Sequence, residues 1–475
     1  MKKLFWLFLF LIPLSGQLMA ELPDIGDSSQ TLISPREEKQ LGQAFMQSVR
    51  QQVTLTSDQD INDYLHKLGQ RLANASDNPT SKFTFFMVED TSINAFAGPG
   101  GYIGINTGLM LLARNESELA GVLAHEIAHV TQRHLYRGFE AADRLSLPTV
   151  AATIAALLLG AATDPSAGIA AASAIQAGNI QYQINFTRSN EKEADRVGIA
   201  ILSKAGFDPQ GMPDFFQQLQ KVNQLYGVAI PEFLSTHPLT LDRIAEAQDR
   251  ASTIRFTGTD RLPIFELMQV RLRVLSSRTP EKSARFYNAE VAKNPESTRL
   301  KYAQSLANYR SNRIEQAISQ MRKLLKNSPD NILFRTTLAN YYSQSGQHSQ
   351  AIKLLKNSHR LYVGNTNITT HYAKILLKAG QTDKALKLLH TLMADNRHHS
   401  IDLYSLLAET AEASGRSWEA RQATAEKYYL QGQTRAAIQQ LKSALMSTKL
   451  DRITQTRIET RLKELKTESL AKHKF

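Results

Sequence analysis

The chain has 475 residues, which is long enough for two or three domains that each bury a core of their own. It contains no cysteine, so disulfide bonds and lipid attachment through cysteine are both excluded. The net charge of +12 is uneven, because residues 281–475 carry 32 Lys and Arg against 16 Asp and Glu, whereas residues 1–280 carry 24 against 28. A basic C-terminal part is typical of proteins that bind acidic partners.

The first 20 residues have the pattern of a secretory signal peptide. Lys2 and Lys3 precede the apolar run Leu4–Leu14, and Ala20 ends a plausible cleavage site. The run is short for a membrane span, so an uncleaved anchor is the less favoured alternative. We therefore expect export to the periplasm, where the chain meets little nucleic acid. Its basic part is then expected to contact acidic protein surfaces or anionic lipid head groups, unless its charges only keep helix exteriors soluble.

Two helices and a small sheet are predicted next. Apolar residues recur with helical spacing from Pro35 to about Asn74. Lys82–Glu89 alternates between apolar and polar residues and predicts a strand, Ser92–Pro99 reads as a turn-rich loop, and Gly100–Asn106 reads as a second short strand.

The sequence His-Glu-Ile-Ala-His at residues 125–129 is the main chemical signal. On a helix, His125 and His129 lie on one face a turn apart, so both imidazoles can reach one metal ion. Glu126 is placed to act as the general base on a zinc-activated water. The alternative is an ordinary amphipathic helix with two surface histidines. The apolar and alanine-rich surroundings argue against it, because they predict a buried helix whose polar groups need partners.

A zinc site of this kind needs a third protein ligand. The spacing used by one class of zinc peptidases would place a histidine at 135, but that residue is Leu135, and His134 is expected at an exposed helix end. Glu191 and Asp195 lie four apart, so Glu191 is expected to bind the metal while Asp195 orients a ligand histidine. Glu193 is the competing ligand, and a solvated charged helix is the remaining alternative.

An alanine-rich segment, residues 148–178, separates these two helices. Polar, proline and glycine residues interrupt its apolar sequence, which argues against a membrane span. We expect a buried helical hairpin between the zinc helix and the Glu191 helix, with a lid or a membrane contact as the alternatives.

His237, which precedes Pro238, and Arg243 on the following helix are further candidates. A loop histidine can fill the open zinc position and hold the enzyme inactive until substrate displaces it. Alternatively, His237 or Arg243 stabilises the oxyanion of the tetrahedral intermediate. In the remaining alternative, His237 only supports local structure.

The C-terminal part repeats with a period of 34 or 35 residues. Glycine and alanine recur at matching positions, as expected where helix hairpins turn and pack closely. The recurring residues are Gly346, Gly380 and Gly415; Ala339, Ala373 and Ala408; and Ala317, Ala351, Ala385 and Ala420. About four tetratricopeptide repeats are predicted, with an atypical register after Gly432.

The motifs together resemble a known family. His-Glu-Ile-Ala-His at 125–129, the distant pair Glu191 and Asp195, and the segment 94–109 are similar to the gluzincin peptidases related to the CAAX-prenyl proteases and the mitochondrial Oma-type enzymes. The resemblance covers nearly the whole chain after the signal sequence once the repeats are included.

The resemblance implies a site and partners. Zinc, one ion per chain, would be bound by His125, His129 and Glu191, with Glu126 as base and His237 as the family's histidine before proline. The partners implied for the basic repeat domain are unfolded or misassembled outer-membrane proteins and their assembly machinery, and a chaperone role is implied beside proteolysis.

If the chain is a peptidase, the second predicted strand is expected to bind substrate. Gly101, Tyr102 and Ile103 are expected to form an edge beside the metal that pairs with an extended substrate backbone. The alternative is a purely structural strand.

We therefore predict an α+β chain that is mainly helical. Residues 1–20 are the signal peptide, 21–262 a gluzincin-type zinc peptidase domain with a small β-sheet, and 263–475 an α-solenoid of tetratricopeptide repeats. The predicted function is a secreted zinc endopeptidase acting on misfolded or stalled outer-membrane proteins. The alternatives are a non-catalytic chaperone or scaffold stabilised by zinc, and a membrane-embedded prenyl-type protease, which the lack of spans disfavours.

Overall fold

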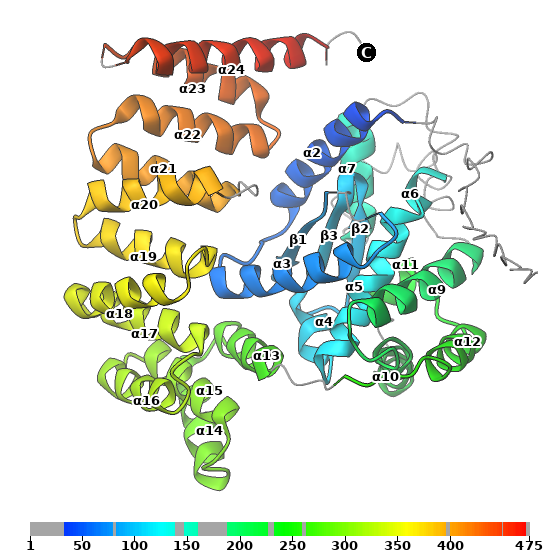
Figure 1. The fold of residues 1–475 in the computed structure, drawn as a ribbon. Helices are drawn as coiled ribbons and strands as arrows, with labels where there is room; N and C mark the ends of the chain where they lie inside the picture. The colour runs from blue at the N-terminus through cyan, green and yellow to red at the C-terminus, as the bar shows by residue number, and fades with distance from the viewer. Residues whose placement is uncertain are drawn as a thin grey trace, which may run out of the picture.

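The structure is a computed structural model that describes residues 33–78, 82–137, 147–159, 188–226, 232–258, 263–395, 400–448 and 450–471. The predicted signal peptide and its cleavage site lie outside these residues, as does most of the alanine-rich segment. Figure 1 shows a small sheet surrounded by helices in the first half of the chain, followed by a curved stack of helices. The predicted α+β, mainly helical fold class is confirmed.

Three short strands form the sheet, in the order β1-β3-β2. β1 (Thr84–Val88) pairs in parallel with β3 (Tyr102–Asn106), and β2 (Ala95–Gly98) pairs antiparallel with the other side of β3. The stretch predicted to be only a loop therefore contains β2.

The prediction that Gly101, Tyr102 and Ile103 form an edge is wrong. Gly101 belongs to a short 3₁₀ turn, Pro99–Gly101, and Tyr102 and Ile103 lie in β3, which has a partner on each side. Its backbone hydrogen bonds are directed to β1 and β2, so it has none to offer a peptide. The outer strand on that side is β2.

Helices cover both faces of the sheet. α3 (Gln59–Asn74) and α5 (Glu116–Thr131) pack on one face, where Ile103 and Ile105 are fully buried. α2 (Pro35–Gln52) and α7 (Leu147–Leu158) cover the other face, where Phe86 and Phe96 join the same core as Phe45 and Ile154. The start of the alanine-rich segment is thus a helix packed in this second core.

Further helices occur in the described part of the first half. They are α4 (Thr107–Leu112), α6 (His134–Arg137), α9 (Arg188–Lys204), α10 (Gly211–Tyr226), α11 (Glu232–Thr236) and α12 (Leu241–Ser252). α9 and α10 both pack directly against α5, and α12 packs against both of them.

The second half is a series of antiparallel helices. They are α13 (Pro263–Leu275), α14 (Pro280–Lys293), α15 (Thr298–Arg310), α16 (Ile314–Asn327), α17 (Ile332–Gln344), α18 (His348–Leu361), α19 (Thr366–Lys378), α20 (Thr382–Asp395), α21 (Ile401–Ala413), α22 (Ser417–Leu430), α23 (Thr434–Leu445) and α24 (Arg452–Ala471).

The predicted hairpin turns lie where the glycine spacing indicated. Gly346, Gly380 and Gly415 adopt φ of 78°, 71° and 70°, a left-handed conformation that glycine reaches without steric cost. Asn312 takes the same position one period earlier with φ 62°, and asparagine is among the few other residues that tolerate it. The repeat prediction is confirmed for this part of the chain.

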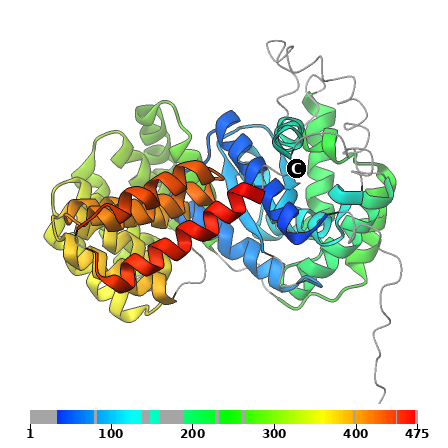
Figure 2. The same ribbon diagram turned by 90° about the horizontal axis from the view of Figure 1, so that it is seen from above.

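The stack of helices packs back onto the first half. Asp60 of α3 accepts hydrogen bonds from Thr336 and Asn367 at 3.2 and 2.9 Å. Lys39 of α2 donates to the hydroxyl of Tyr429 at 2.9 Å. Both ribbon views show the C-terminal end of α24 close to α2 (Figures 1 and 2). Among the described residues, no helix is both long and apolar enough to cross a membrane.

Candidate metal centre

The centre is built on α5. Asn115 caps the helix by accepting a hydrogen bond from the backbone N–H of Glu118 at 2.9 Å. Further along the helix, His125, Glu126 and His129 are 0–2% exposed. A buried charged or polar group is costly unless it is paired or bound to a metal, so this trio requires partners from the neighbouring helices.

α9 approaches α5 closely enough to supply them. A Cβ at Gly198 would lie 3.1 Å from the backbone nitrogen of His125 and 2.7 Å from Cε of Met212. A larger residue would therefore have to push α9 away from α5 by a few tenths of an ångström. With glycine at this position, Glu191, in the first turn of α9, reaches the histidines of α5.

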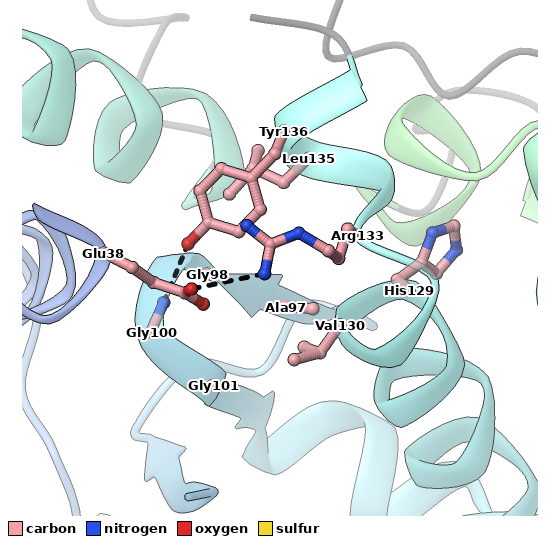
Figure 3. Close-up of a pocket in the computed structure, with 10 residues that line it drawn as sticks. All are labelled: Glu38, Ala97, Gly98, Gly100, Gly101, His129, Val130, Arg133, Leu135 and Tyr136. Carbon is pink, nitrogen blue, oxygen red and sulfur yellow. Dashed lines mark hydrogen bonds and ion pairs between the residues drawn. The ribbon is translucent and has the colours of Figure 1, made fainter. Parts of the chain in front are cut away.

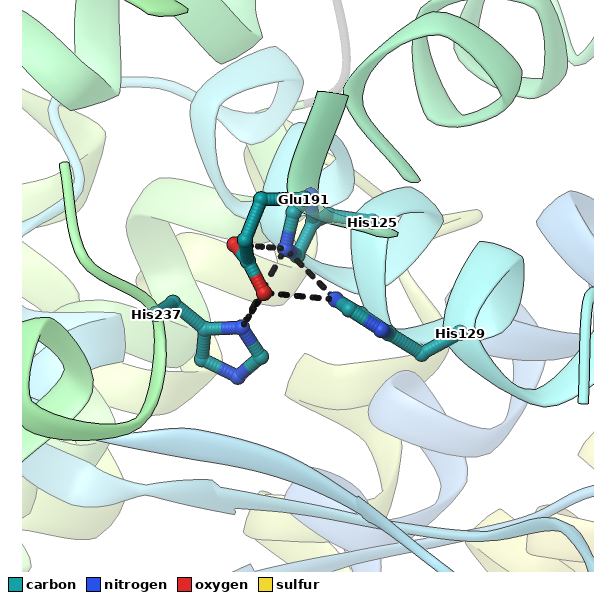
Figure 4. Close-up of side chains that lie close together, drawn as sticks. All are labelled: His125, His129, Glu191 and His237. Atoms are coloured by element: carbon teal, nitrogen blue, oxygen red, sulfur yellow. Dashed lines mark hydrogen bonds and ion pairs between the residues drawn. The ribbon is translucent and has the colours of Figure 1, made fainter. Parts of the chain in front are cut away.

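Four side chains converge at this point, as Figure 4 shows: His125, His129, Glu191 and His237. Nε2 of His125 lies 3.0 Å from Nε2 of His129 and 3.4 Å from Nδ1 of His237. Oε1 of Glu191 lies 3.0 Å from Nδ1 of His237 and 3.5 Å from Nε2 of His129. All four ligand atoms lie within 4.8 Å of one another.

This donor set fits a zinc ion. Zinc bonds of about 2.0–2.1 Å in a tetrahedron place neighbouring ligand atoms roughly 3.3 Å apart. The four contact distances given above, 3.0 to 3.5 Å, are close to that separation. Three imidazole nitrogens and one carboxylate oxygen are also donors that zinc accepts. The residues predicted as ligands, together with His237, are thus brought together.

Asp195 and Arg243 form the layer behind these side chains. Oδ1 of Asp195 lies 2.9 Å from Nδ1 of His125, within hydrogen-bond distance, as expected for a carboxylate that orients a ligand. Arg243 donates to both oxygens of Asp195 at 2.8 Å, and its Nη1 lies 2.7 Å from Oε2 of Glu191. Burial alone would raise the pKa of Asp195, but hydrogen bonds from His125 and Arg243 hold that pKa below its ordinary value.

Arg243 is therefore occupied by the site's own carboxylates. Its Nη1 also donates to the carbonyl of Pro238 at 2.8 Å, which ties down the loop that carries His237. These contacts favour a role in holding Glu191, Asp195 and the His237 loop over the oxyanion role that the sequence left open.

Glu126 lies beside the ligands without joining them. Burial raises the pKa of its carboxyl, and the charges of His237 and His125 partly offset this effect. Nε2 of His237 lies 3.5 Å from Oε1 of Glu126. A carboxylate held next to a metal site is suited to accept and return a proton.

His134 and Glu193 are not where the sequence placed them. His134, expected at an exposed helix end, is 1% exposed, and its Nδ1 lies 2.9 Å from Nδ1 of His129. Glu193, the competing ligand, instead contacts His134 and Arg137, each at 3.1 Å. Nothing in the residue spacing signalled this pairing, because it depends on a reversal of the chain at Arg133, where φ is 55°.

A small hollow, with room for about one water molecule, opens between β2 and the end of α5 (Figure 3). Ala97, Gly98 and Val130 form its apolar side, and Glu38 and Arg133 form its polar side. Nη1 of Arg133 lies 3.5 Å from Oε2 of Glu38. The hollow thus lies beside the outer strand of the sheet and also reaches His129.

Comparison with known proteins agrees with this geometry. Residues 60–251 match Peptidase family M48, and residues 342–410 match a tetratricopeptide repeat. The beta-barrel assembly-enhancing protease of Escherichia coli is 33% identical over 94% of this chain and 91% of its own length. A Vibrio cholerae relative is 37% identical over 94% of this chain and 92% of its own.

More distant relatives match a smaller share of the chain. The mitochondrial metalloendopeptidase OMA1 of Schizosaccharomyces pombe is 28% identical over 39% of this chain and 52% of its own length. The chain is a metalloendopeptidase of Peptidase family M48 with C-terminal tetratricopeptide repeats, and belongs to the family of the beta-barrel assembly-enhancing proteases.

Proposed function

We propose that the chain is a zinc endopeptidase of the bacterial periplasm that hydrolyses misassembled or stalled outer-membrane β-barrel proteins. The observation that carries the proposal is the buried donor set of His125, His129 and Glu191 with Glu126 beside it. A purely structural zinc site has no need of such a base. The substrate class rests on the similarity to beta-barrel assembly-enhancing proteases, and the compartment rests on the predicted signal peptide at residues 1–20.

The chain's own residues divide the work of hydrolysis. A zinc ion held by His125, His129 and Glu191 would supply Lewis-acid polarisation to the attacking water and the scissile carbonyl. Glu126 accepts the proton of the attacking water and delivers it to the leaving nitrogen. Asp195 keeps His125 oriented, and the burial of the site excludes other water.

His237 acts as a latch on this centre. Its Nδ1 is one of the four converging ligand atoms, so it takes the position that substrate needs. The segment that carries His237 is anchored, because the backbone N–H of Phe233 donates to the carbonyl of Ile93 at 3.1 Å. The Phe233 ring also stacks on His237, with 4.8 Å between centroids. When substrate displaces it, the imidazole is close enough to contact the developing oxyanion, which is the second role open to it.

An extended substrate lies along β2. This strand is the outer one, it contacts α5, and the backbone of Ala97 is close enough to Glu126 to lower its pKa. A peptide added to that edge would run past Glu126, with its backbone over the small hollow lined by Gly98 and Val130.

The repeats hold the partners. Residues 281–475 carry 32 Lys and Arg against 16 Asp and Glu, which favours acidic protein surfaces. Tetratricopeptide arrays bind proteins through their surfaces. A chaperone role that does not require cleavage is the second candidate function, favoured by the large share of the chain that the repeats occupy.

Two variants separate the candidates. Glu126→Gln should keep zinc and lose cleavage of an unfolded outer-membrane protein, because the amide cannot accept the proton. Glu191→Ala should lose zinc as well. If Glu126→Gln still supports outer-membrane assembly in cells, the scaffold or chaperone function is the principal one. Persistent cleavage in Glu126→Gln would exclude the proposed base.

A further inference from the structure

Behind His129 lies a series of hydrogen-bonded side chains, which we term the His129 chain, and the proposed function assigns it no role. Nδ1 of His129 lies 2.9 Å from Nδ1 of His134, and Nε2 of His134 lies 3.1 Å from Oε2 of Glu193. Arg137 donates to that same oxygen at 3.1 Å. His129 and His134 are 2% and 1% exposed, whereas the side chain of Glu193 is 28% exposed. The His129 chain therefore runs from the metal centre to the surface.

The Glu193 carboxylate, at the surface end, determines which atom donates in each of these hydrogen bonds. An ionised carboxylate only accepts, so Nε2 of His134 must carry the proton that it donates to Glu193. A neutral His134 then has a lone pair on Nδ1, and His129 must donate to it from its own Nδ1. This leaves Nε2 of His129 unprotonated, and that atom is the one that lies 3.0 Å from Nε2 of His125 among the ligand atoms.

The two ligand histidines of α5 are therefore held differently. His125 faces a carboxylate directly, since Oδ1 of Asp195 lies 2.9 Å from its Nδ1. His129 faces an imidazole, and its carboxylate, Glu193, lies one step further away. Three acids of α9 thus serve three purposes: Glu191 among the ligands, Asp195 behind His125 and Glu193 at the end of the His129 chain.

The backbone conformation after α5 makes the His129 chain possible. α5 ends at Thr131, and Arg133 takes φ 55°, a left-handed conformation that is strained for a non-glycine residue. The resulting reversal starts α6 at His134 and returns that imidazole beneath His129. The contacts of His134 and Arg137 with Glu193 hold the reversed segment against α9.

We propose that His134 and Glu193 are positioning residues that fix His129 as its Nδ1–H tautomer and so set how tightly the centre holds its metal. The inference rests on the proposed zinc site but is independent of the substrate. Hydrogen-bond partners behind a metal ligand typically change metal affinity about 10- to 100-fold when removed. A loss of that size is expected on removing the acceptor at His134.

The test measures zinc affinity of the full chain by competition with a chromogenic chelator, and the melting temperature of the zinc-free chain. His134→Phe keeps the ring volume but removes the acceptor, and should weaken zinc binding about 10- to 100-fold. His134→Asn places an amide oxygen where Nδ1 was, and should restore most of the affinity. At saturating zinc, KM for a peptide should be unchanged in both variants.

A second variant guards against a folding defect in His134→Phe. Glu193→Leu changes a partly exposed side chain and removes only the outer acceptor, and should weaken zinc binding several-fold. Lys192→Met is the matched control, because its ammonium pairs with Glu246 at the surface, 3.0 Å away, and it should bind zinc as the unaltered chain does.

Two results would overturn the inference. Unchanged zinc affinity in both His134→Phe and Glu193→Leu would show that the chain behind His129 does not set metal binding, while zinc-dependent cleavage by the unaltered chain would leave the proposed function intact. Equal losses in His134→Asn and His134→Phe would show that the acceptor is not what matters. An unaltered chain that binds no zinc would instead refute the proposed function itself.

Discussion

Replacing Arg271 by methionine should loosen the repeats from the peptidase half. The guanidinium is buried between α13, α3 and the repeat helices. It donates to both carboxylate oxygens of Asp58 at 2.9 and 2.8 Å, and lies 3.0 Å from Oδ2 of Asp60. It also donates to the hydroxyl of Tyr302 at 2.8 Å, so one side chain bonds residues from both halves of the chain.

The size of the effect follows from the carboxylate of Asp60, which stays buried when Arg271 is replaced. Asp60 is 1% exposed, and burial alone would raise its pKa, but Arg271 and His371 hold it well below the ordinary value. Removing one partner of a buried ion pair costs about 3–5 kcal/mol, because the remaining charge stays buried without its counter-charge. Methionine fills much of the volume, so little of this cost comes from a cavity.

Hydrogen exchange is the appropriate assay, because a chain of two halves need not unfold in one step. The backbone amides of α3 and α19, which lie side by side, should exchange roughly 10²- to 10⁴-fold faster in Arg271→Met. Arg273→Met, exposed on the same helix, is the matched control and should change exchange little.

A double variant adds a stricter condition. Adding Asp60→Asn to Arg271→Met should recover part of the protection, because a neutral amide no longer needs the counter-charge. If Arg271→Met exchanges like Arg273→Met, the buried ion pair contributes nothing to the contact between the halves, and the reasoning fails.

Three further outcomes are expected. His237→Ala should raise kcat/KM for an unfolded protein substrate if the latch dominates and lower it if the oxyanion contact dominates; unchanged kinetics would rule out both roles. The lowered pKa of Asp60 contributes stability above the unfolded-state value of about 3.9, and this contribution is lost as the pH falls below it. Melting temperatures measured from pH 6 to pH 3 should therefore fall more steeply in the unaltered chain than in Asp60→Asn, and parallel curves would refute the assignment. Gly198→Val should destabilise the chain by about 1–3 kcal/mol in denaturant unfolding and weaken zinc binding, because a Cβ there meets the backbone of His125 at 3.1 Å; retention of both properties would contradict the close-packing argument.

The sequence predicted the parts of this site that depend on helical periodicity. His125 and His129 share a face because they lie four apart on one helix, and Glu191 and Asp195 do so on another. The repeats were predictable for a similar reason, since each turn needs a left-handed residue and the glycines recur at the period. The structure adds that Asn312 performs the same task in the repeat before Gly346.

The parts that depend on long-range pairing were not predictable. β2 is four residues, Ala-Phe-Ala-Gly, between an asparagine and a proline, so its local signal is that of a loop. Only its pairing with β3 makes it a strand, and this pairing is also what places Tyr102 and Ile103 in the centre of the sheet. The edge was therefore assigned to the wrong strand.

The burial of His134 was hidden for a different reason. A helix continued past Thr131 would carry position 134 away from the site, and sequence gives no sign that Arg133 adopts a positive φ. The contact of His134 with Glu193 then joins residues 59 positions apart. Such side chains behind a metal site are set by tertiary structure, so residue spacing alone does not reveal them.

The most direct test of the account is to measure zinc content and cleavage together, in the chain without its first 20 residues and in Glu126→Gln. The account predicts about one zinc per chain in both proteins and cleavage of an unfolded outer-membrane protein only in the first. Zinc-independent cleavage, or equal cleavage by Glu126→Gln, would contradict the assignment of Glu126 as the base of a zinc peptidase.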